Sequence, residues 1–481
     1  MYLARVTKDE IIAQQAKEIA VLKFELGQLK KLIFGSKHER FVPSATANQA
    51  SLFGSAENGP TIVTPETEKV SYTRQKGKKQ HPGRHAIPEH LPVKEVIIEP
   101  QEDTKQLTKI GEERTETLEY TPASLVKKIT IRPKYAKPEG EGVLIGELPE
   151  RPITKGIPEA SLLAHILCSK FIDHLPFYRQ IQRFKRNYDW EVRSSTMSDW
   201  FLSCFDLLQP LYTHMLGQVL ARGYLQADES PIKVLDADKP GATHRGYQWV
   251  YHSPEENIVV FRYRKGRGQH GPKETLADYK GWLQCDGYTV YDKIGAKPGI
   301  KLAGCWAHAR RKFHEAKDSD PHRSDFALAI IQKIYLQESQ LKGLPPHQRM
   351  EVRQGKTLAL TKQFKDWLDE EGVKVLPKSP MGKAMTYAQN QWPKLKAVFE
   401  DGRLEIDNNL IENKIRPLAL GRKNYLFAGS HRAAQGIAMF YTFFGTCKAR
   451  EVNPYEWLKH TLEQIKSTKL SQIGTLVPGE R

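Results

Sequence analysis

Residues 223–430 of this 481-residue chain predict an α/β domain built around a mixed sheet. Three apolar segments between residues 224 and 261 have the lengths and spacing of strands in an antiparallel meander. A helix-compatible stretch at 273–279 then precedes a fourth strand at 281–285, and a fifth strand ends near Trp306. Three strands, a helix and further strands is the order of an RNase H-like domain, in which the first and fourth strands are neighbours.

Two aspartates end the first and fourth of these strands in the same local pattern. Asp228 closes Gly-Tyr-Leu-Gln-Ala-Asp at 223–228, and Asp286 closes Gly-Trp-Leu-Gln-Cys-Asp at 281–286. The two aspartates are 58 residues apart (286 − 228), which leaves room for the intervening strands and helix. We therefore expect both carboxylates to lie at one edge of the sheet.

A third acid, Glu412, follows 126 residues after Asp286 (412 − 286), far more than one crossover connection needs. Apolar residues at helical spacing within that interval predict a helical insertion at about 318–400. Asp407 or Asn408 can cap the next helix, which places Glu412 about one turn into it.

The side-chain chemistry of Asp228, Asp286 and Glu412 predicts a site for two Mg²⁺ or Mn²⁺ ions. Carboxylates hold such hard cations and leave coordination positions for phosphate oxygens and water. Two ions roughly 3.5–4 Å apart activate the attacking hydroxyl and neutralise the leaving oxygen when a phosphodiester is cut. The three acids are therefore predicted to be both the metal ligands and the catalytic residues.

Other interpretations of the acids stay open at the level of the sequence. Asp-Gly at 286–287 is a standard turn pair, and Glu412 has basic neighbours with which it could form a surface ion pair. Glu229 is a rival for the first position, and Glu405 and Asp407 are rivals for the third.

The composition indicates a polyanionic partner and a cytoplasmic, nucleoid-associated protein with no membrane partner. Lys and Arg total 73 against 56 Asp and Glu, the net charge is +17 and the pI is near 9.4. This surplus favours nucleic acid, although many basic proteins are merely soluble. The five cysteines are scattered without a C-x-x-C pair, which suits a reducing compartment. No apolar run approaches the length of a bilayer span, and the first residues do not resemble a signal peptide.

The rest of the chain divides by pattern and composition. A seven-residue apolar repeat within 8–36 predicts a coiled-coil helix, although an amphipathic helix packed on its own domain also fits. The predicted regions are a coiled-coil helix at 1–41, a flexible basic linker at 42–90, a small β-rich module at 91–157, a helical region at 158–222 and a C-terminal helical segment at 431–481.

The helical region at 158–222 has two interpretations. Ser194-Ser195-Thr196 offers N-caps for a helix that continues through Leu207. Two short helices with arginines nearby fit a helix-turn-helix reader of DNA, and an ordinary helical bundle fits equally well.

Basic residues beside the acids are expected to hold DNA. Phosphate binding is favoured where a helix begins, because its first backbone N–H groups have no partner. Cys305 and His308 have the spacing of a metal-binding pair but lack two further ligands, so His308 is expected to orient DNA or a carboxylate, or to pack. The candidate DNA contacts are His308, Arg310, Arg311, Lys312, Arg416, Arg422, Lys423 and Arg432.

Six ordered segments carry a recognisable pattern. They are Ala-Asp-Glu-Ser-Pro at 227–231, Cys-Asp-Gly-Tyr at 285–288, Gly-Cys-Trp-Ala-His-Ala-Arg-Arg-Lys-Phe at 304–313, Gly-Arg-Leu-Glu-Ile-Asp-Asn-Asn-Leu-Ile-Glu-Asn at 402–413, Arg-Lys-Asn-Tyr-Leu-Phe-Ala-Gly-Ser at 422–430 and Asn-Pro-Tyr-Glu-Trp-Leu at 453–458. Together they resemble the bacterial insertion sequence 66 transposases, which belong to the DDE class. The resemblance covers nearly the whole chain.

This resemblance implies a transposase that binds the terminal inverted repeats of its element, cleaves at the ends and transfers strands. Asp228, Asp286 and Glu412 would be its acidic triad. The implied partners are double-stranded DNA, as element ends and as target, and a second copy in a homodimer or larger assembly formed through the coiled coil. Companion proteins encoded by the element are a further candidate partner.

In one respect the sequence departs from the family. Many members carry a cysteine-based zinc module before the helical region, but no cysteine stands at 99–103 or 135–139 here. A structural zinc needs about four nitrogen or sulfur ligands, so we expect a β-rich module without zinc.

Two other functions fit the same residues. One is an RNase H-like DNA nuclease or resolvase that hydrolyses without joining, and the other is a catalytically silent DNA-binding protein. Insertion of a pre-cleaved end into target DNA would distinguish the transposase from the nuclease. Replacing Asp286 by Asn would separate an enzyme from a silent binder.

Overall fold

The computed structural model describes residues 87, 89, 91–102, 107–121, 124–138, 142–236, 239 and 241–480. They belong to one compact unit, which spans residues 81–481. The coiled coil predicted over 8–36, and nearly all of the linker predicted over 42–90, lie outside the described residues. Within the part of the chain that is described, no helix is both long and apolar enough to cross a membrane.

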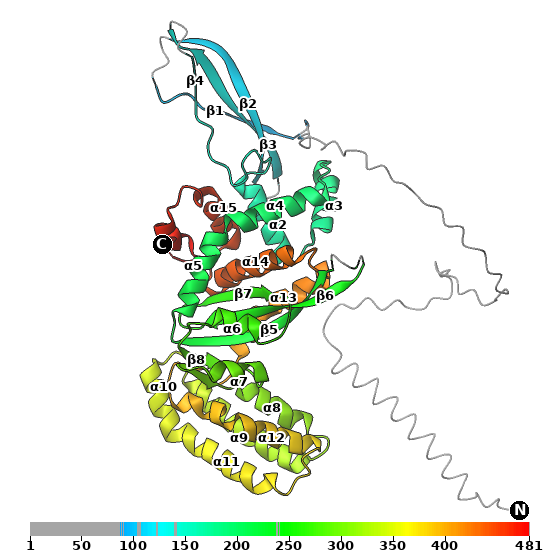
Figure 1. The fold of residues 1–481 in the computed structure, drawn as a ribbon, viewed down its shortest axis with the longest axis vertical. Coiled ribbons are helices and arrows are strands. Elements are labelled where there is room, and N and C mark those ends of the chain that lie inside the picture. The colour runs from blue at the N-terminus through cyan, green and yellow to red at the C-terminus, as the bar shows by residue number, and fades with distance from the viewer. Residues whose placement is uncertain are drawn as a thin grey trace, which may run out of the picture. The chain divides into compact units, whose positions relative to one another are not determined.

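A five-stranded mixed sheet carries two of the predicted acids (Figure 1). Its order is β7-β6-β5-β8-β9, with antiparallel pairing in β5–β6 and β6–β7 and parallel pairing in β5–β8 and β8–β9. The first and fourth strands of this domain are therefore neighbours, as the sequence predicts. The strands are β5 (Tyr224–Leu235), β6 (Thr243–Ser253), β7 (Ile258–Arg264), β8 (Gly281–Gln284) and β9 (Ile300–Ala303).

The connections between the last three strands differ in part from the prediction. The helix expected at 273–279 is α6 (His270–Thr275), which begins and ends earlier. Pro272 has no N–H to donate, so it is tolerated best in a first helical turn, which requires the helix to begin before it. A second helix, α7 (Thr289–Gly295), joins β8 to β9 and was not predicted.

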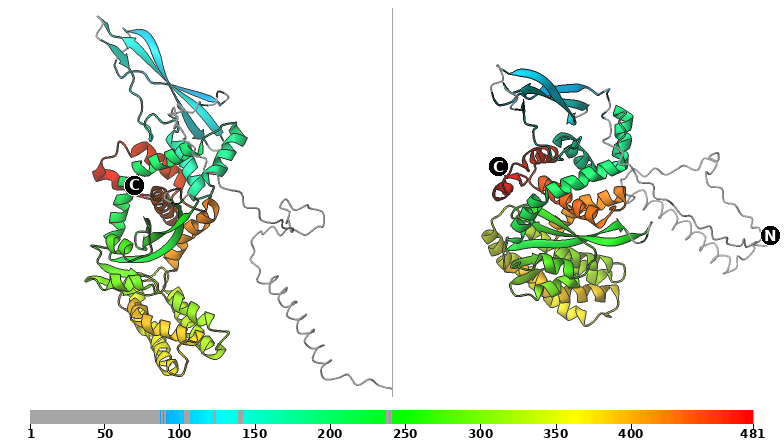
Figure 2. Two further views of the ribbon diagram at one scale, coloured as in Figure 1. Left: turned by 45° about the vertical axis from the view of Figure 1, so that its right-hand side comes forward. Right: turned by 45° about the horizontal axis from the view of Figure 1, so that its top comes forward.

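Two helices that follow the insertion pack on this sheet, and these orange helices lie against the green strands in each view (Figure 2). α13 (Asn409–Tyr425) precedes α14 (His431–Ala449), which lies along the edge strand β7. The hydroxyl groups of Thr442 and Thr446 accept hydrogen bonds from the backbone N–H groups of Phe261 (2.9 Å) and Val259 (3.3 Å). These contacts protect an edge that would otherwise be open to pairing with another chain. Residues on both sides of position 430 therefore share one core.

The interval between β9 and α13 folds into helices, as the 126-residue separation predicts. These helices bury their own apolar cluster, which includes Trp306, Phe313, Phe364 and Leu368. The elements are α8 (Trp306–Glu315), α9 (Pro321–Gln340), α10 (Pro346–Val352), the π-helical turn η2 (Arg353–Thr357), α11 (Leu358–Gly372), α12 (Pro380–Leu395) and the 3₁₀ helix η3 (Lys396–Phe399).

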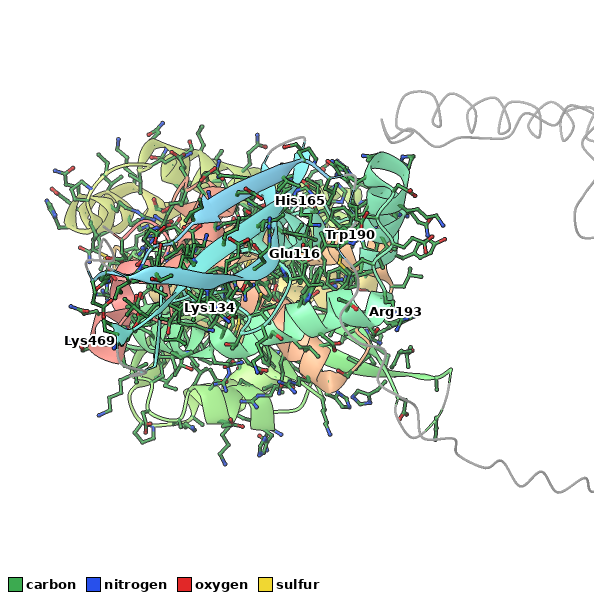
Figure 3. The ribbon with its side chains drawn as sticks, turned by 90° about the horizontal axis from the view of Figure 1, so that it is seen from above. Glu116, Lys134, His165, Trp190, Arg193 and Lys469 are labelled. Atoms are coloured by element: carbon green, nitrogen blue, oxygen red, sulfur yellow. The ribbon has the colours of Figure 1, made fainter. Side chains whose placement is uncertain are left out.

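A second sheet forms within the region that was predicted to be β-rich. Its order is β1-β3-β2, and β4 also pairs with β3. Figure 3 looks onto this sheet and labels Glu116 and Lys134, with His165 of the following helix beside it. Tyr120 of β2 stacks on His165, with ring centroids 4.0 Å apart, so this sheet is docked on the helical region. The strands are β1 (Val93–Ile97), β2 (Thr108–Thr121), β3 (Ser124–Ala136) and β4 (Val143–Ile145).

Four helices then lead to β5, and one predicted cap is wrong. The helix expected after residue 193 begins at Ser194 itself, with Arg193 as the N-cap and no side-chain hydrogen bond there. Arg193 has the extended backbone (φ −75°, ψ 146°) that a cap position needs, so the serines fall inside the first turn. The helices are α2 (Ala160–Phe171), α3 (Phe177–Tyr188), α4 (Ser194–Leu207) and α5 (Gln209–Leu220), and the chain ends with α15 (Pro454–Gln464) and η4 (Leu470–Leu476).

Candidate active site

The register between β5 and β8 sets Asp228 beside Asp286. The last parallel pair joins Gln226 to Gln284, and each aspartate stands two residues further along its strand direction (228 − 226 and 286 − 284). β8 ends at Gln284, so Asp286 lies just past the strand, where its Oδ1 accepts the N–H of Tyr288 at 2.9 Å. Both aspartates are half-buried.

Glu412 comes to the same place from the first turn of α13. Asn408, the residue before the helix, donates its side-chain Nδ2–H to the carbonyl of Ala227 at 3.3 Å and its backbone N–H to Sγ of Cys305 at 3.2 Å. These bonds fix the start of the helix next to the end of β9 and beside the residue that precedes Asp228. Neither predicted cap acts in the usual way, because Asn408 binds β5 with its side chain and Asp407 accepts the N–H of Asn409 at 2.9 Å.

The pKa of Asp228 depends on the charges of the other two acids. Burial raises the pKa of Asp228 to about 8, and the negative charges of Glu229, Asp286 and Glu412 add to the rise, while a hydrogen bond from the N–H of Glu229 opposes it. A charge acts strongly on a carboxyl only at short range. Two acids that are 58 and 184 residues further along the chain (286 − 228 and 412 − 228) therefore lie within electrostatic range of Asp228.

Glu229, the alternative to Asp228 as the first acid of the site, is bound by two other side chains. The Glu229 side chain is 3 % exposed, and its Oε1 accepts from Nε (2.8 Å) and Nη2 (2.7 Å) of Arg267. Its Oε2 accepts from the hydroxyl of Tyr291 at 3.0 Å. Burial raises the pKa of Glu229, and the bond to Arg267 opposes that rise. Glu229 thus serves as a structural ion-pair residue next to Asp228.

The rivals for the third position are engaged as well. Glu405 accepts from Nη1 of Arg349 at 3.1 Å. Asp407 accepts from the hydroxyl of Tyr335 at 2.8 Å and from the side chain of Asn409 at 2.7 Å.

Asp228, Asp286 and Glu412 differ from Glu229 and Glu405, which are each paired with an arginine. Across the described ranges, no Lys or Arg side chain forms an ion pair with any of them, in a protein with a net charge of +17. A basic side chain that lies close to one of them is His308, whose Nε2 is 3.9 Å from Oε1 of Glu412. The Nδ1 of His308 is buried without a hydrogen-bond partner among the residues that the structure describes. His308 therefore lies beside Glu412, and whether it orients DNA, orients this carboxylate or simply packs stays a prediction.

The three carboxylates do not form a closed ligand set in this conformation. In the described part of the chain, no group of three or more His, Cys, Asp or Glu side chains is arranged to hold a metal ion. The donor chemistry nevertheless fits Mg²⁺ or Mn²⁺, because the carboxylates of Asp286 and Glu412 both lie within electrostatic reach of Asp228.

The sequence analysis missed a buried hydrogen-bond network directly below the aspartates. Gln226 and Gln284 are both fully buried, and the Nε2–H of Gln226 donates to Oε1 of Gln284 at 3.1 Å. Gln284 donates in turn to the carbonyls of Gly304 (3.0 Å) and Glu405 (2.6 Å). The repeated Leu-Gln-x-Asp at 225–228 and 283–286 was the signal that could have revealed this pair.

Of the basic residues predicted to contact DNA, some are exposed and others are bound to groups within the protein. Arg310, Arg311, Arg416 and Lys423 are exposed, and Lys312 is exposed but bound to Glu315 at 3.0 Å. Arg422 and Arg432 are committed elsewhere. Nη1 of Arg422 donates to Oγ of Ser230 (2.8 Å) and to the carbonyl of Pro231 (2.6 Å), and Arg432 forms an ion pair with Asp206 at 2.5 Å.

Three family descriptions match this chain. "Transposase IS66 family" matches residues 155–436, "IS66 C-terminal element" matches 442–478 and "Transposase C of IS166 homeodomain" matches 21–96. Among curated proteins, the uncharacterized protein y4qI of Sinorhizobium fredii (strain NBRC 101917 / NGR234) is 33% identical over 99% of this chain and 92% of its own length. The uncharacterized protein y4jD of the same strain is 30% identical over 97% of this chain and 96% of its own length.

Proposed function

Because this chain belongs to the IS66 family of transposases, we propose that it binds the terminal inverted repeats of an insertion sequence and catalyses metal-dependent cleavage and strand transfer. We further propose that its acidic triad is Asp228, Asp286 and Glu412. Its substrates are double-stranded DNA, both the element ends and the target. Its place of action is therefore the DNA of the cytoplasmic nucleoid.

One observation supports this proposal more strongly than any other observation does. Within the described residues, three acids from distant segments lie near one another without an ion pair to Lys or Arg, whereas Glu229 and Glu405 nearby are each paired with an arginine. Like charges placed together cost free energy unless a cation joins them, so such a cluster indicates a site that awaits metal and phosphate. The sheet order, in which the first and fourth strands are neighbours, supports an RNase H-like catalytic domain.

In this proposal the three carboxylates hold Mg²⁺ or Mn²⁺ after their side chains turn toward a common ion. Bound metal would supply Lewis-acid stabilisation of the phosphodiester oxygens and lower the pKa of the attacking group. The role of this chain's residues is to fix the ligands. Asp228 and Asp286 are fixed by the β5–β8 register, and Glu412 is fixed through the bond from Asn408 to Ala227.

We propose that the basic residues around the acids contact DNA. Residues that are exposed and have no ion-pair partner are better candidates than those already bound to other groups. Arg310, Arg311, Arg416 and Lys423 are exposed and are the strongest candidates. His308 lies beside Glu412, while Lys312, Arg422 and Arg432 would have to leave their present partners to contact phosphate. A homodimer through the N-terminal coiled coil, with companion proteins of the element, remains part of the proposal.

Purified full-length protein, given Mg²⁺ and a duplex that carries a pre-cleaved element end, tests the function. We expect the 3′-hydroxyl of that end to be joined to a target duplex. Asp286→Asn and Glu412→Gln should each lower joining by roughly 10³-fold, because loss of a metal ligand removes several kcal/mol of transition-state stabilisation. DNA binding in the presence of a chelator should be kept.

Glu405→Gln is the matched control, because it removes an acid close to Glu412 that is bound to Arg349. It should keep most of the joining activity. Hydrolysis without any joining would instead identify a nuclease or resolvase. Wild-type joining in Asp286→Asn would rule out the acidic triad, whereas wild-type protein that binds DNA but neither joins nor hydrolyses it would be a protein that only binds DNA.

A further inference from the structure

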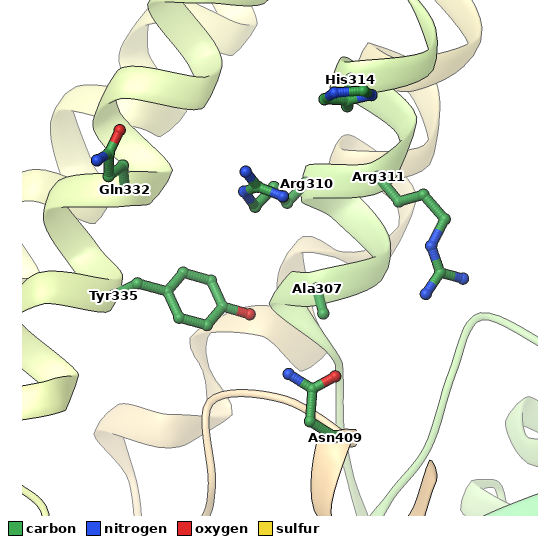
Figure 4. A pocket seen from close by; sticks show the side chains of 7 residues that line it. All are labelled: Ala307, Arg310, Arg311, His314, Gln332, Tyr335 and Asn409. Atoms are coloured by element: carbon green, nitrogen blue, oxygen red, sulfur yellow. The ribbon is translucent and has the colours of Figure 1, made fainter. Parts of the chain in front are cut away.

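A cavity of about 520 Å³ opens between the helical insertion and the catalytic part (Figure 4). α8 contributes Ala307, Arg310, Arg311 and His314 to its lining. The remaining lining residues come from two other segments, Gln332 and Tyr335 from α9 and Asn409 from α13. In Figure 4 Arg310 reaches from α8 toward Tyr335, and the phenol ring faces it across the cavity.

The cavity adjoins the proposed third acid on two sides. Asn409, on its floor, begins α13 three residues before Glu412 (412 − 409). Ala307 precedes His308, whose Nε2 is 3.9 Å from Glu412. The cavity therefore lies beside Glu412 along α8 and α13.

The lining is positively charged. Two arginines and a histidine border it, and none of the described residues contributes a carboxylate to the lining. Asp407 lies behind the lining, but its Oδ2 is already bound by the Tyr335 hydroxyl (2.8 Å) and the Asn409 amide (2.7 Å). Among described residues neither Arg310 nor Arg311 forms an ion pair. An exposed guanidinium without a carboxylate is suited to a phosphate, which it can bind through two parallel N–H groups.

The volume of the cavity and its uncharged lining residues indicate which part of a DNA molecule could bind there. A volume of 520 Å³ falls within the range for small-molecule sites and is far too small for a duplex. Unpaired bases are held by stacking on aromatic rings and by amide hydrogen bonds to their edges. Tyr335 offers such a ring, and Gln332 offers an amide.

We propose that this cavity binds one unpaired nucleotide of the DNA strand that flanks the cleaved bond, with its phosphate on Arg310 and its base beside Tyr335. The proposal rests on the DNA-processing function above and adds a site that the helical insertion helps to build. It gives α9 a direct role in substrate binding.

The test uses the full-length protein in chelator, so that no chemistry takes place. Binding of a duplex with a short unpaired extension is compared with binding of the same duplex with blunt ends. We expect the extension to raise the affinity of the wild-type protein about tenfold, since stacking of one base contributes roughly 1–3 kcal/mol. Arg310→Gln and Gln332→Ala should each remove most of this preference.

Lys333→Gln is the matched control, because Lys333 is an exposed neighbour of Gln332 outside the lining. It should keep the wild-type preference. Arg310→Gln should also reduce the slope of log K against log salt by about 0.7 with the extended duplex, the value for one phosphate on a single strand. All three side chains are exposed, so unchanged melting temperatures confirm that the variants are folded.

Two results would overturn the proposal. One is a wild-type protein that binds both duplexes equally, and the other is an Arg310→Gln protein with the full preference and the full salt slope. Neither depends on catalysis. A protein that binds the extension through Arg310 but never joins DNA would keep this site and refute the transposase function. A protein that joins DNA but binds extended and blunt duplexes equally would keep the transposase function and refute the nucleotide site.

Discussion

Gln226 of β5 and Gln284 of β8 are paired in register, and each stands two residues before a candidate catalytic aspartate. Besides bonding to each other, they bind the loop that leads into α13, because Gln284 donates to the carbonyl of Glu405 and Gln226 to the carbonyl of Asp407 at 3.3 Å. The two glutamines therefore link the strands of both aspartates to the helix that carries Glu412.

Replacing Gln284 by Leu should harm both stability and activity. The carbonyls of Gly304 and Glu405 would lose a buried donor, which costs about 1–3 kcal/mol for an unsatisfied group. Joining should also fall roughly 10–100-fold, because the loop before α13, which positions the proposed metal ligand Glu412, would lose its bond to β8. Urea unfolding and the rate of end joining measure the two effects.

Gln248→Leu separates positioning from stability. Gln248 is an equally buried strand glutamine, on β6, and it donates to the carbonyl of Ala434 in α14 at 2.9 Å, away from the loop before α13. We expect a similar loss of stability with near wild-type joining. Equal losses of activity in both variants would mean that Gln284 acts only through general stability.

Much of the site could be predicted from local sequence. Strand period and the repeated Gly-aromatic-Leu-Gln-x-Asp locate Asp228 and Asp286, and the order of elements makes their strands neighbours. The insertion followed from simple chain length between Asp286 and Glu412. These features depend on spacing and periodicity, which the sequence displays directly.

Pairings between distant segments could not be predicted in this way. Glu229 looks as available as Asp228 until Arg267, 38 residues later, is seen to bind it. Glu405 likewise meets Arg349, 56 residues earlier, across the insertion. Which acid is neutralised by a cation depends on the register and docking of elements, and neither leaves a local trace in the chain.

Metal binding should release a proton near neutral pH. The pKa of Asp228 is raised to about 8 in the metal-free protein, so at pH 7 its carboxyl is mostly protonated. A metal ligand must be deprotonated, so Mg²⁺ binding should release close to one proton from this group. Calorimetric titration of Mg²⁺ in buffers of different ionisation enthalpy measures the number of protons released per metal ion bound. Asp228→Asn should abolish the release and Glu405→Gln should keep it; a wild-type value of zero would contradict the assignment.

The same carboxyl should make the metal-free protein less stable as pH rises. Its ordinary pKa is 3.8 and its folded value is about 8, so between these values the native state holds a proton that the unfolded chain has lost. Stability from this group is therefore present at low pH and declines up to pH 8, by at most about 1.4 kcal/mol per pH unit. The advantage of Asp228→Asn over wild type in chemical unfolding should grow across this window and level off above it. A constant difference would show that Asp228 does not titrate there.

Adjacent residues on α13 should respond differently to loss of charge. Arg422 binds Oγ of Ser230 and the carbonyl of Pro231, so Arg422→Gln should destabilise the protein by about 1–3 kcal/mol. Lys423 is exposed, so Lys423→Gln should leave stability within about 0.5 kcal/mol. If Lys423 contacts a phosphate, the salt slope of duplex binding falls by about 0.9 in that variant. Urea unfolding and salt-dependent binding of both variants decide the matter. A reduced slope in Arg422→Gln with unchanged stability would mean that its guanidinium leaves β5 for DNA, and would reverse the roles assigned to the two residues.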